Sequence, residues 1–359
     1  MSGTAGLTAA GSEARVPEQG GSLEWAGELL VPALREAVAE LPEPERLIEG
    51  YHRGWHPADG RPPSPAAEPG GRPGGKAVRP ALVFLAARAV GGTAECAVPG
   101  AVAVELVHDF SLLHDDVIDG DPLRRHRPAA WTVYGTPAAV LAGDALLVVA
   151  LRTLSAVPGV RGAAALRELV ATLADLMRGQ SQDVAFEREE RVGARDYLAM
   201  AEGKTGALMG GACALGAVLA GADERRVAAL REFGRRLGVA FQCADDLLAI
   251  WGDSRRSGKP VGADLAARKK SLPVVVALAD DGAAGRGLAE LYGRPGPLDA
   301  AAVAAAARLV EEAGGRAATE REAQRQVTAA LRALAGARPA PEAYRQLHAV
   351  AQAMTRRDR

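Results

Sequence analysis

The chain has 359 residues, of which 48% are hydrophobic and 24% charged, a balance typical of a folded globular protein and not of a disordered one. Its 43 basic and 44 acidic residues leave a net charge of −1, so we expect no nucleic-acid partner. The three cysteines, Cys96, Cys213 and Cys243, form no CxxC pair. They support neither a zinc site nor a disulfide framework and favour a cytoplasmic location.

The N-terminal segment predicts no ordered element. Residues 1–21 are rich in Gly, Ser and Ala and contain no apolar run of seven or more, so we expect a disordered extension and not a secretory signal. We expect residues 22–359 to form one domain, interrupted by a flexible Pro/Gly-rich loop over residues 56–75.

Apolar positions recur at helical spacing along most of the remaining chain, and alternating strand patterns are scarce. The spacing predicts helices over residues 23–41, 80–90, 99–119, 137–156, 162–190, 195–220, 223–251, 299–313, 316–335 and 341–356. The sequence therefore predicts an all-α, single-domain bundle of about ten or more helices around a central cavity, with its site facing the bundle interior.

One uncharged stretch raises the question of a membrane span. Residues 205–222 are long enough to cross a bilayer, but most of them are Gly and Ala, which gain little from insertion into hydrocarbon. We expect a buried helix whose small side chains let its neighbours approach closely, and no membrane span.

The helix predicted over residues 99–119 ends in an acidic cluster, Asp115, Asp116 and Asp119. At about 100° per residue, Asp115 and Asp119 share a stripe with His108, which lies two turns earlier. Like charges one turn apart repel each other, and the helix dipole disfavours anions at a C-terminus. We therefore expect a cation at this helix end.

The helix predicted over residues 223–251 carries a second cluster, in which Gln242, Asp245 and Asp246 lie at i, i+3 and i+4. A single acidic motif can be a solvated helix face, but two copies flanked by Leu, Ile, Val and Phe are hard to place at a surface. Carboxylate oxygens favour Mg²⁺, which keeps several waters and shares its coordination shell with substrate phosphates.

The basic residues point to the same kind of ligand. Only five of the 43 are lysine, and in a chain this rich in Arg they are candidates for sites that need a compact ammonium, although scattered lysines can also have no function. Candidate anion-binding groups lie near these motifs. Lys76 and Arg79 are at a predicted helix start, and Arg124 and Arg125 directly follow the first acidic cluster. Lys204 and Thr205 begin the small-residue helix, and Lys259 follows the second cluster. A metal-bound anion with several phosphates would meet all of them.

At these residues the chain resembles the trans-isoprenyl diphosphate synthase (polyprenyl synthetase) family. The resemblance runs from about Glu24 to the C-terminus. It rests on GGKAVRP (74–80), HDDVIDGDPLRRHRP (114–128), Gly179 and Gln180 with Asp183, Lys204 with Thr205, FQCADD (241–246) and GKPVGADLAARKKSLP (258–273). The second acidic motif departs from the family pattern, because Ala249 stands where a third Asp is usual.

The resemblance implies the fold of isoprenoid synthases and the condensation of isopentenyl diphosphate with an allylic diphosphate, catalysed by a homodimer. About three Mg²⁺ ions would balance the charge of the substrates and the acidic clusters. It implies Asp115, Asp119 and Asp245 as metal ligands, with Asp116 and Asp246 beside them. It implies Lys76, Arg79, His108 and Arg125 for isopentenyl diphosphate. For the allylic diphosphate it implies Arg124, Gln180, Lys204, Thr205, Gln242, Lys259 and Lys269.

Product length in this family depends on the residues four and five before the first Asp, here Ser111 and Phe110. Helix angles place Ser111 near the acidic stripe and Phe110 well away from it, so the small residue should line the pocket. The motif also lacks the insertion seen in many bacterial farnesyl diphosphate synthases. We therefore expect a C20 product, geranylgeranyl diphosphate, with the C15 farnesyl product as the alternative.

Two further alternatives remain open. A class I terpene cyclase of the same fold would need the acidic motifs but not the four groups assigned to isopentenyl diphosphate. A non-catalytic partner subunit should have lost one acidic cluster, and only Ala249 points that way.

Overall fold

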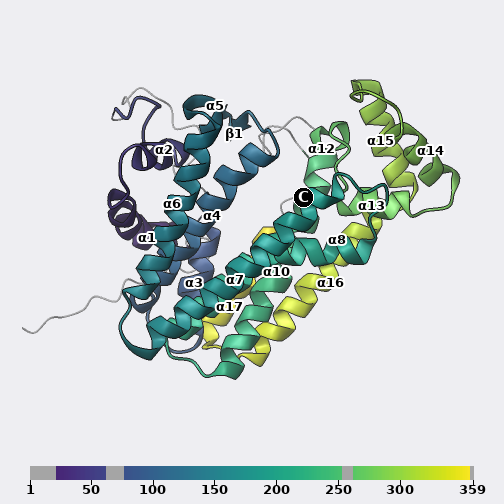
Figure 1. Cartoon of the computed structure of the whole chain (residues 1–359). Coiled ribbons are helices and arrows are strands. Elements are labelled where there is room, and N and C mark those ends of the chain that lie inside the picture. Colours follow the sequence, from purple (N-terminus) through teal and green to yellow (C-terminus); the bar gives the residue numbers. More distant parts are fainter. Residues whose placement is uncertain (1–21, 62–76, 253–261, 356–359) are drawn as a thin grey trace, which may run out of the picture.

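The computed structural model describes residues 22–61, 77–252 and 262–355 (Figure 1). Within them the helices are α1 (Ser22–Ala39), α2 (Glu45–His52), α3 (Val78–Ala89), η1 (Glu95–Ala97), α4 (Val98–Ile118), α5 (Ala130–Tyr134), α6 (Thr136–Ser155), α7 (Gly159–Phe186), α8 (Ala194–Ala201), η2 (Glu202–Gly206), α9 (Ala207–Leu219), α10 (Glu224–Trp251), α12 (Ala263–Ala266), α13 (Leu272–Leu278), α14 (Ala283–Tyr292), α15 (Ala300–Glu312), α16 (Gly315–Gly336) and α17 (Pro341–Thr355). Two short antiparallel strands, β1 (Leu123–Arg124) and β2 (Arg127–Pro128), form a hairpin. The all-α prediction is confirmed. The expected N-terminal extension and most of the expected loop over residues 56–75 lie outside the described residues.

The centre of the bundle is α9, which packs against α3, α7 and α10. Every residue of α9 except Val218 is buried, and most of them are Ala or Gly. Small side chains let the surrounding helices approach closely, so the burial of this segment confirms the expected small-residue helix. The main core continues through α4, which packs on α6, and through α10, which packs on α16.

Close helix contacts at glycines hold η2 in place. A Cβ on Gly203 would lie 2.8 Å from the Cα of Gly179 on α7, and a Cβ on Gly238 of α10 would lie 2.6 Å from the Cα of Gly206. Since real side chains do not tolerate such distances, these positions need glycine. The two contacts bring η2 directly against α7 and α10.

The structure differs from the predicted helices where short or irregular elements occur. The predicted helix over residues 195–220 is divided into α8, the π-helical turn η2 and α9. The helical spacing of apolar residues does not predict α2, α5, α13 or α14, and no turn signal predicts the β1–β2 hairpin. These elements are too short for a reliable periodicity, and packing against the bundle stabilises them.

Two segments are long and apolar enough to cross a membrane by length and composition alone, 95–118 and 136–155. The most apolar window of the first is 67% buried inside the protein, and that of the second, which is α6, is 39% buried. Buried core helices pass the same length test, so these two segments are weak grounds for a membrane span. The partial burial of α6 leaves an apolar face exposed.

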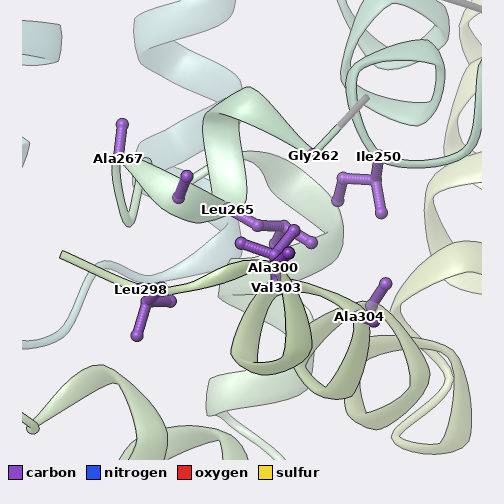
Figure 2. Close-up of a pocket in the computed structure, with 10 residues that line it drawn as sticks. Ile250, Gly262, Leu265, Ala267, Leu298, Ala300, Val303 and Ala304 are labelled. Atoms are coloured by element: carbon purple, nitrogen blue, oxygen red, sulfur yellow. The ribbon is translucent and has the colours of Figure 1, made fainter. Parts of the chain in front are cut away.

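Helices α12 to α15 surround a smaller separate core at the end of the molecule away from α1 and α2 (Figure 1). A pocket of about 690 Å³ lies there between α10, α12 and α15, with Ile250, Leu265 and Val303 in its lining (Figure 2). All of the described residues that line it are apolar. It therefore lacks the groups that would bind a diphosphate.

Candidate active site

The first acidic cluster lies where α4 ends. Asp116 is 1% exposed, and Arg124 Nε donates to its Oδ1 at 2.8 Å. Asp115 lies at the same helix end. Burial and the nearby Asp119 raise its pKa, whereas Lys204 lowers it. The pKa of Asp115 is raised overall, so its negative charge is incompletely balanced by the protein. The cation expected at this helix end would supply the missing charge.

The β1–β2 hairpin presents the bases that follow this cluster. Arg124 pairs with Arg127 across the hairpin, and the turn residues Arg125 and His126 have φ of 51° and 62°. Positive φ at both turn residues is the type I′ geometry, which matches the twist of the flanking strands. The Tyr51 hydroxyl of α2 donates to Pro128 O at 2.8 Å, which holds the hairpin against α2. The two arginines that the sequence places after the acidic cluster therefore turn back towards α4.

A second basic group forms where α3 begins. Arg79 Nη1 lies 3.1 Å from His108 Nε2, and burial lowers the pKa of His108 well below its usual value, with Arg79 and Arg125 lowering it further. The imidazole is therefore neutral and accepts the hydrogen bond at Nε2, because a guanidinium can only donate. The structure thus brings together Arg79, His108 and Arg125, which are far apart in sequence.

Lys204 and Thr205 lie on η2, in the π-helical turn. Lys204 Nζ donates to Asp183 Oδ2 of α7 at 2.6 Å, and Thr205 Oγ1 donates to Gln242 Oε1 of α10 at 2.7 Å. Both contacts depend on the close glycine packing of η2 against these helices. Irregular π turns frequently lie at functional sites, where they redirect side chains.

The second acidic cluster lies near the end of α10. Asp246 is 4% exposed and accepts three hydrogen bonds: from Tyr197 Oη at 2.5 Å, Leu272 N at 3.0 Å and Gln242 Nε2 at 3.0 Å. Burial raises its pKa to about 6, although all three hydrogen bonds lower it. Asp246 therefore ties α10 to α8 and α13, while Asp245 is the half-buried member of the pair.

Carboxylates of both acidic clusters raise the pKa of one lysine, Lys269. Burial alone would lower the pKa of Lys269. Four nearby carboxylates outweigh the effect of burial and raise the pKa above its usual value; in order of effect they are Asp183, Asp264, Asp119 and Asp246. Asp119 belongs to the first cluster and Asp246 to the second. The clusters, about 130 residues apart in sequence, therefore converge on one region of the molecule.

Two donors near these groups have no partner among the described residues. Gln180 Nε2 and Arg79 Nε are both buried and make no hydrogen bond. Unsatisfied buried donors are rare in folded proteins, and at a binding site they are the atoms that a ligand satisfies. An anionic ligand would offer acceptors to both.

The proposed chain-length residues differ in their surroundings. Phe110 is 4% exposed, and its ring packs at 4.7 Å on the ring of His114. Ser111 is half-buried, and its hydroxyl donates to His108 O at 2.7 Å within α4. Phe110 is thus a packing residue, and Ser111 is the smaller and more exposed of the two.

Lys76 and Lys259 lie outside the described residues. The other predicted site residues are on α3, α4, the hairpin, α7, η2, α10 and the segment after α12. Within the described part of the chain, no three carboxylate, imidazole or thiol groups meet as a closed metal site. Asp115, Asp119 and Asp245 offer only oxygen ligands, which fits Mg²⁺ shared with a substrate phosphate better than an all-protein cage.

Sequence reasoning missed Tyr197 and Arg53. Tyr197 is buried and donates to Asp246, and Arg53 is buried beside three carboxylates. Neither has a sequence signal of its own, because the charged or polar partners that define its role lie on other helices. The spacing of Glu49 and Arg53 at i, i+4 is the only local hint for Arg53.

The chain is similar to known proteins in sequence and in fold. The family model for polyprenyl synthetase matches residues 67–310. The chain is 46% identical to a geranylgeranyl diphosphate synthase of Mycobacterium tuberculosis over 328 residues, which is 91% of each chain. It is also 46% identical to a (2E,6E)-farnesyl diphosphate synthase of the same species over 309 residues, 85% of this chain and 84% of that one. A crystal structure of a polyprenyl synthetase from Streptomyces coelicolor is 44% identical, with a TM-score of 0.87, and covers 93% of this chain and 98% of that one.

Proposed function

The chain belongs to the polyprenyl synthetase family, and from that premise we propose which of its residues bind each substrate and how long its product is. It is a prenyltransferase that condenses isopentenyl diphosphate with an allylic diphosphate to give a short-chain prenyl diphosphate. The observation that supports the residue assignment best is the convergence of both acidic clusters on Lys269.

We assign the acidic side to the allylic diphosphate. The groups around the two clusters are Arg124, Lys204, Thr205, Gln242 and Lys269. Gln180 Nε2 is a buried donor without a hydrogen-bond acceptor among the described residues. Asp115, Asp119 and Asp245 would hold Mg²⁺. When bound, Mg²⁺ would neutralise the charge that develops on the departing pyrophosphate. Lys204 and Arg124 stabilise the same charge from the protein side, and Lys259 joins them in the proposal.

We assign the basic side to isopentenyl diphosphate. Arg79 at the start of α3 contacts His108 of α4, and Arg125 of the hairpin turn acts electrostatically on the same histidine. Lys76 completes the proposed set. Neutral His108 positions Arg79 without adding charge. This arrangement would place the alkene of isopentenyl diphosphate next to the allylic carbon that loses its diphosphate. Exclusion of bulk water would protect the allylic cation until the alkene attacks it.

For the product we propose geranylgeranyl diphosphate. Ser111 supports this choice because it is half-buried and its side chain is small. The farnesyl product is the second candidate, since the relatives named for the two products are equally identical to the chain.

We further propose that the protein is a cytoplasmic homodimer. The exposed apolar side chains of α6 and α7 support this, among them Leu141 at 59%, Val148 at 62% and Val170 at 52% exposure. Large apolar side chains exposed together on neighbouring helices often mark protein contacts. Cys213 and Cys243 are buried and free, as a reducing compartment requires.

Incubation of purified protein with Mg²⁺, labelled isopentenyl diphosphate and each allylic primer tests the proposal. We expect label in a C20 alcohol after dephosphorylation, and none when Mg²⁺ is chelated. Label that stops at C15 would favour the farnesyl alternative. A cyclic hydrocarbon formed from the primer alone would indicate a cyclase and contradict the assignment of Arg79 and Arg125.

A further inference from the structure

A group of charged side chains lies buried between α2 and α4, beside the arginines assigned above to isopentenyl diphosphate. Glu49, Arg53, Glu105 and Asp109, which we call the buried ion cluster, are each at most 5% exposed. Arg53 Nε donates to Glu49 Oε1 at 2.7 Å, and Arg53 Nη2 donates to Asp109 and lies 3.5 Å from Glu105 Oε1. One guanidinium thus joins three carboxylates.

The buried ion cluster holds more acid than base. His52 Nε2 lies 3.9 Å from Asp109 Oδ1, but burial and then Arg124 lower the pKa of His52 well below its usual value, so it adds no positive charge. Glu49 Oε2 has no hydrogen-bond partner among the described residues, and burial raises the pKa of Glu49 to about 7 although Arg53 lowers it. Buried carboxylates in excess need further cations close by.

Those cations are Arg79 and Arg125. Burial lowers the pKa of Arg79, and Glu105 is the acid that opposes this most strongly. The pKa of Arg125 is also lowered, by burial and by the positive charge of Arg53. The negative charge of Glu105 raises it against both effects. Glu105 lies one turn before His108 on α4, so it faces the contact between His108 and Arg79. Glu105 is therefore the carboxylate of the cluster that lies 3.5 Å from Arg53 and also acts electrostatically on Arg79 and Arg125.

We propose that Arg53 is a positioning residue for the isopentenyl diphosphate site. Arg53 binds Glu49 and Asp109, so these two carboxylates do not attract Arg79 and Arg125. Glu105, which Arg53 shares with Arg79 and Arg125, is then the one carboxylate that orients those two arginines in the absence of substrate. Without Arg53, the buried carboxylates would lose their nearest cation, and Glu105 and Asp109 would compete with the substrate diphosphate for both arginines. This role rests on the assignment of Arg79, His108 and Arg125 in the proposed function, and Arg53 itself does not contact substrate.

The test is the Arg53→Gln variant, assayed beside the wild type at one fixed pH. We expect the KM for isopentenyl diphosphate to rise about tenfold or more, and the KM for the allylic primer to change by less than about twofold. Arg53→Lys keeps the charge but not the three contacts, so its KM for isopentenyl diphosphate should lie between those of the wild type and Arg53→Gln. Arg46→Gln is the matched control, because Arg46 is an exposed arginine on the same helix that pairs only with Glu43 among the described residues.

A charge-balanced double variant separates positioning from simple damage. Arg53→Gln combined with Asp109→Asn removes one charge of each sign, so the KM for isopentenyl diphosphate should return towards the wild-type value. If Arg53→Gln does not fold, Arg53→Lys and the double variant give the same comparison with the wild type.

Three outcomes would overturn the proposal: equal changes in both KM values, no change in either, or a double variant as impaired as the single one. Failure of the wild type to incorporate isopentenyl diphosphate would instead overturn the proposed function. The two failures are therefore distinguishable in one assay.

Discussion

Asp116 and Asp246 hold corresponding places in the two acidic clusters. Each follows another aspartate directly, each is buried, and each is bound by donors of the protein: Arg124 for Asp116, and Tyr197, Leu272 N and Gln242 for Asp246. Their carboxylates already have partners, so their main effect is to orient the helix ends. Asp115 and Asp245 are less buried and are the better candidates for metal ligands.

This division of roles predicts the effect of Tyr197→Phe. The variant keeps the ring but removes the hydroxyl that donates to Asp246. A hydrogen bond to a charged group contributes about 1.5–3 kcal/mol, so we expect kcat/KM to fall about tenfold or more while the fold is retained. Steady-state kinetics and circular dichroism measure the two effects.

Tyr292→Phe is the control, because the Tyr292 hydroxyl is also buried but has no partner among the described residues. Equal activity of both variants would show that the hydroxyl of Tyr197 does not position Asp246.

Ser111 carries the prediction for product length. Ser111→Phe should shorten the main product, because a ring at this position would occupy the space proposed for the growing chain. Ser111→Ala removes the hydroxyl without adding volume and should leave the product unchanged. Chromatography of the dephosphorylated products measures the chain length, and an unaltered distribution in Ser111→Phe would contradict the proposed pocket floor.

At the scale of elements, the π turn η2 positions Lys204 and Thr205. Gly203 touches Gly179 of α7, and this contact brings Lys204 to Asp183. A side chain at position 203 would push η2 away from α7 and move the lysine with it. The turn and the two glycines therefore act as one unit.

We expect Gly203→Ala to destabilise the fold by about 1–3 kcal/mol, the usual cost of overpacking, and to lower activity. Gly336→Ala is the control, because a Cβ there meets nothing within 4 Å in an exposed part of α16. That variant should be neutral or slightly more stable, since alanine favours helix more than glycine. Similar unfolding curves for both variants would show that the Gly179–Gly203 contact is not tight.

The predictability of these elements follows from their length. The long helices α4 and α10 agree with the sequence periodicity within one or two residues, because their apolar faces repeat over several turns. The hairpin and α2 were not predicted: the turn is Arg125-His126, without the Gly or Asn that usually marks positive φ, and α2 has only eight residues. The π turn depends on a contact with α7 that no local pattern contains.

Candidate site residues could be named from the sequence, but their connections could not. Both acidic motifs are visible as spacings on one helix each, so Asp115 and Asp245 stand out as candidates. That both clusters act on Lys269 depends on how the helices pack. The same limit hid Tyr197 and Arg53, whose partners lie on other elements.

At the scale of the whole molecule, α6 and α7 leave an apolar surface exposed. Leu141 and Val148 lie seven residues apart on one face of α6, so they form a stripe and not isolated contacts. A second copy of the chain would cover this stripe in the proposed homodimer.

Val148→Glu should therefore dissociate the dimer, because burying a charge in an apolar interface is costly. Light scattering coupled to size-exclusion chromatography measures the mass in solution. Val31→Glu on α1, where Val31 is 39% exposed, should leave the mass of the wild type. A wild-type protein with the mass of a single chain would contradict the proposed assembly.

The central claim is that the two acidic helix ends share Mg²⁺ and one diphosphate. A crystal structure with Mg²⁺ and a non-hydrolysable bisphosphonate tests it most directly. We predict density for metal ions bound by Asp115 and Asp119 on one side of the bisphosphonate and by Asp245 on the other. A bisphosphonate bound elsewhere, with Asp115 and Asp245 facing separate regions of solvent, would contradict it.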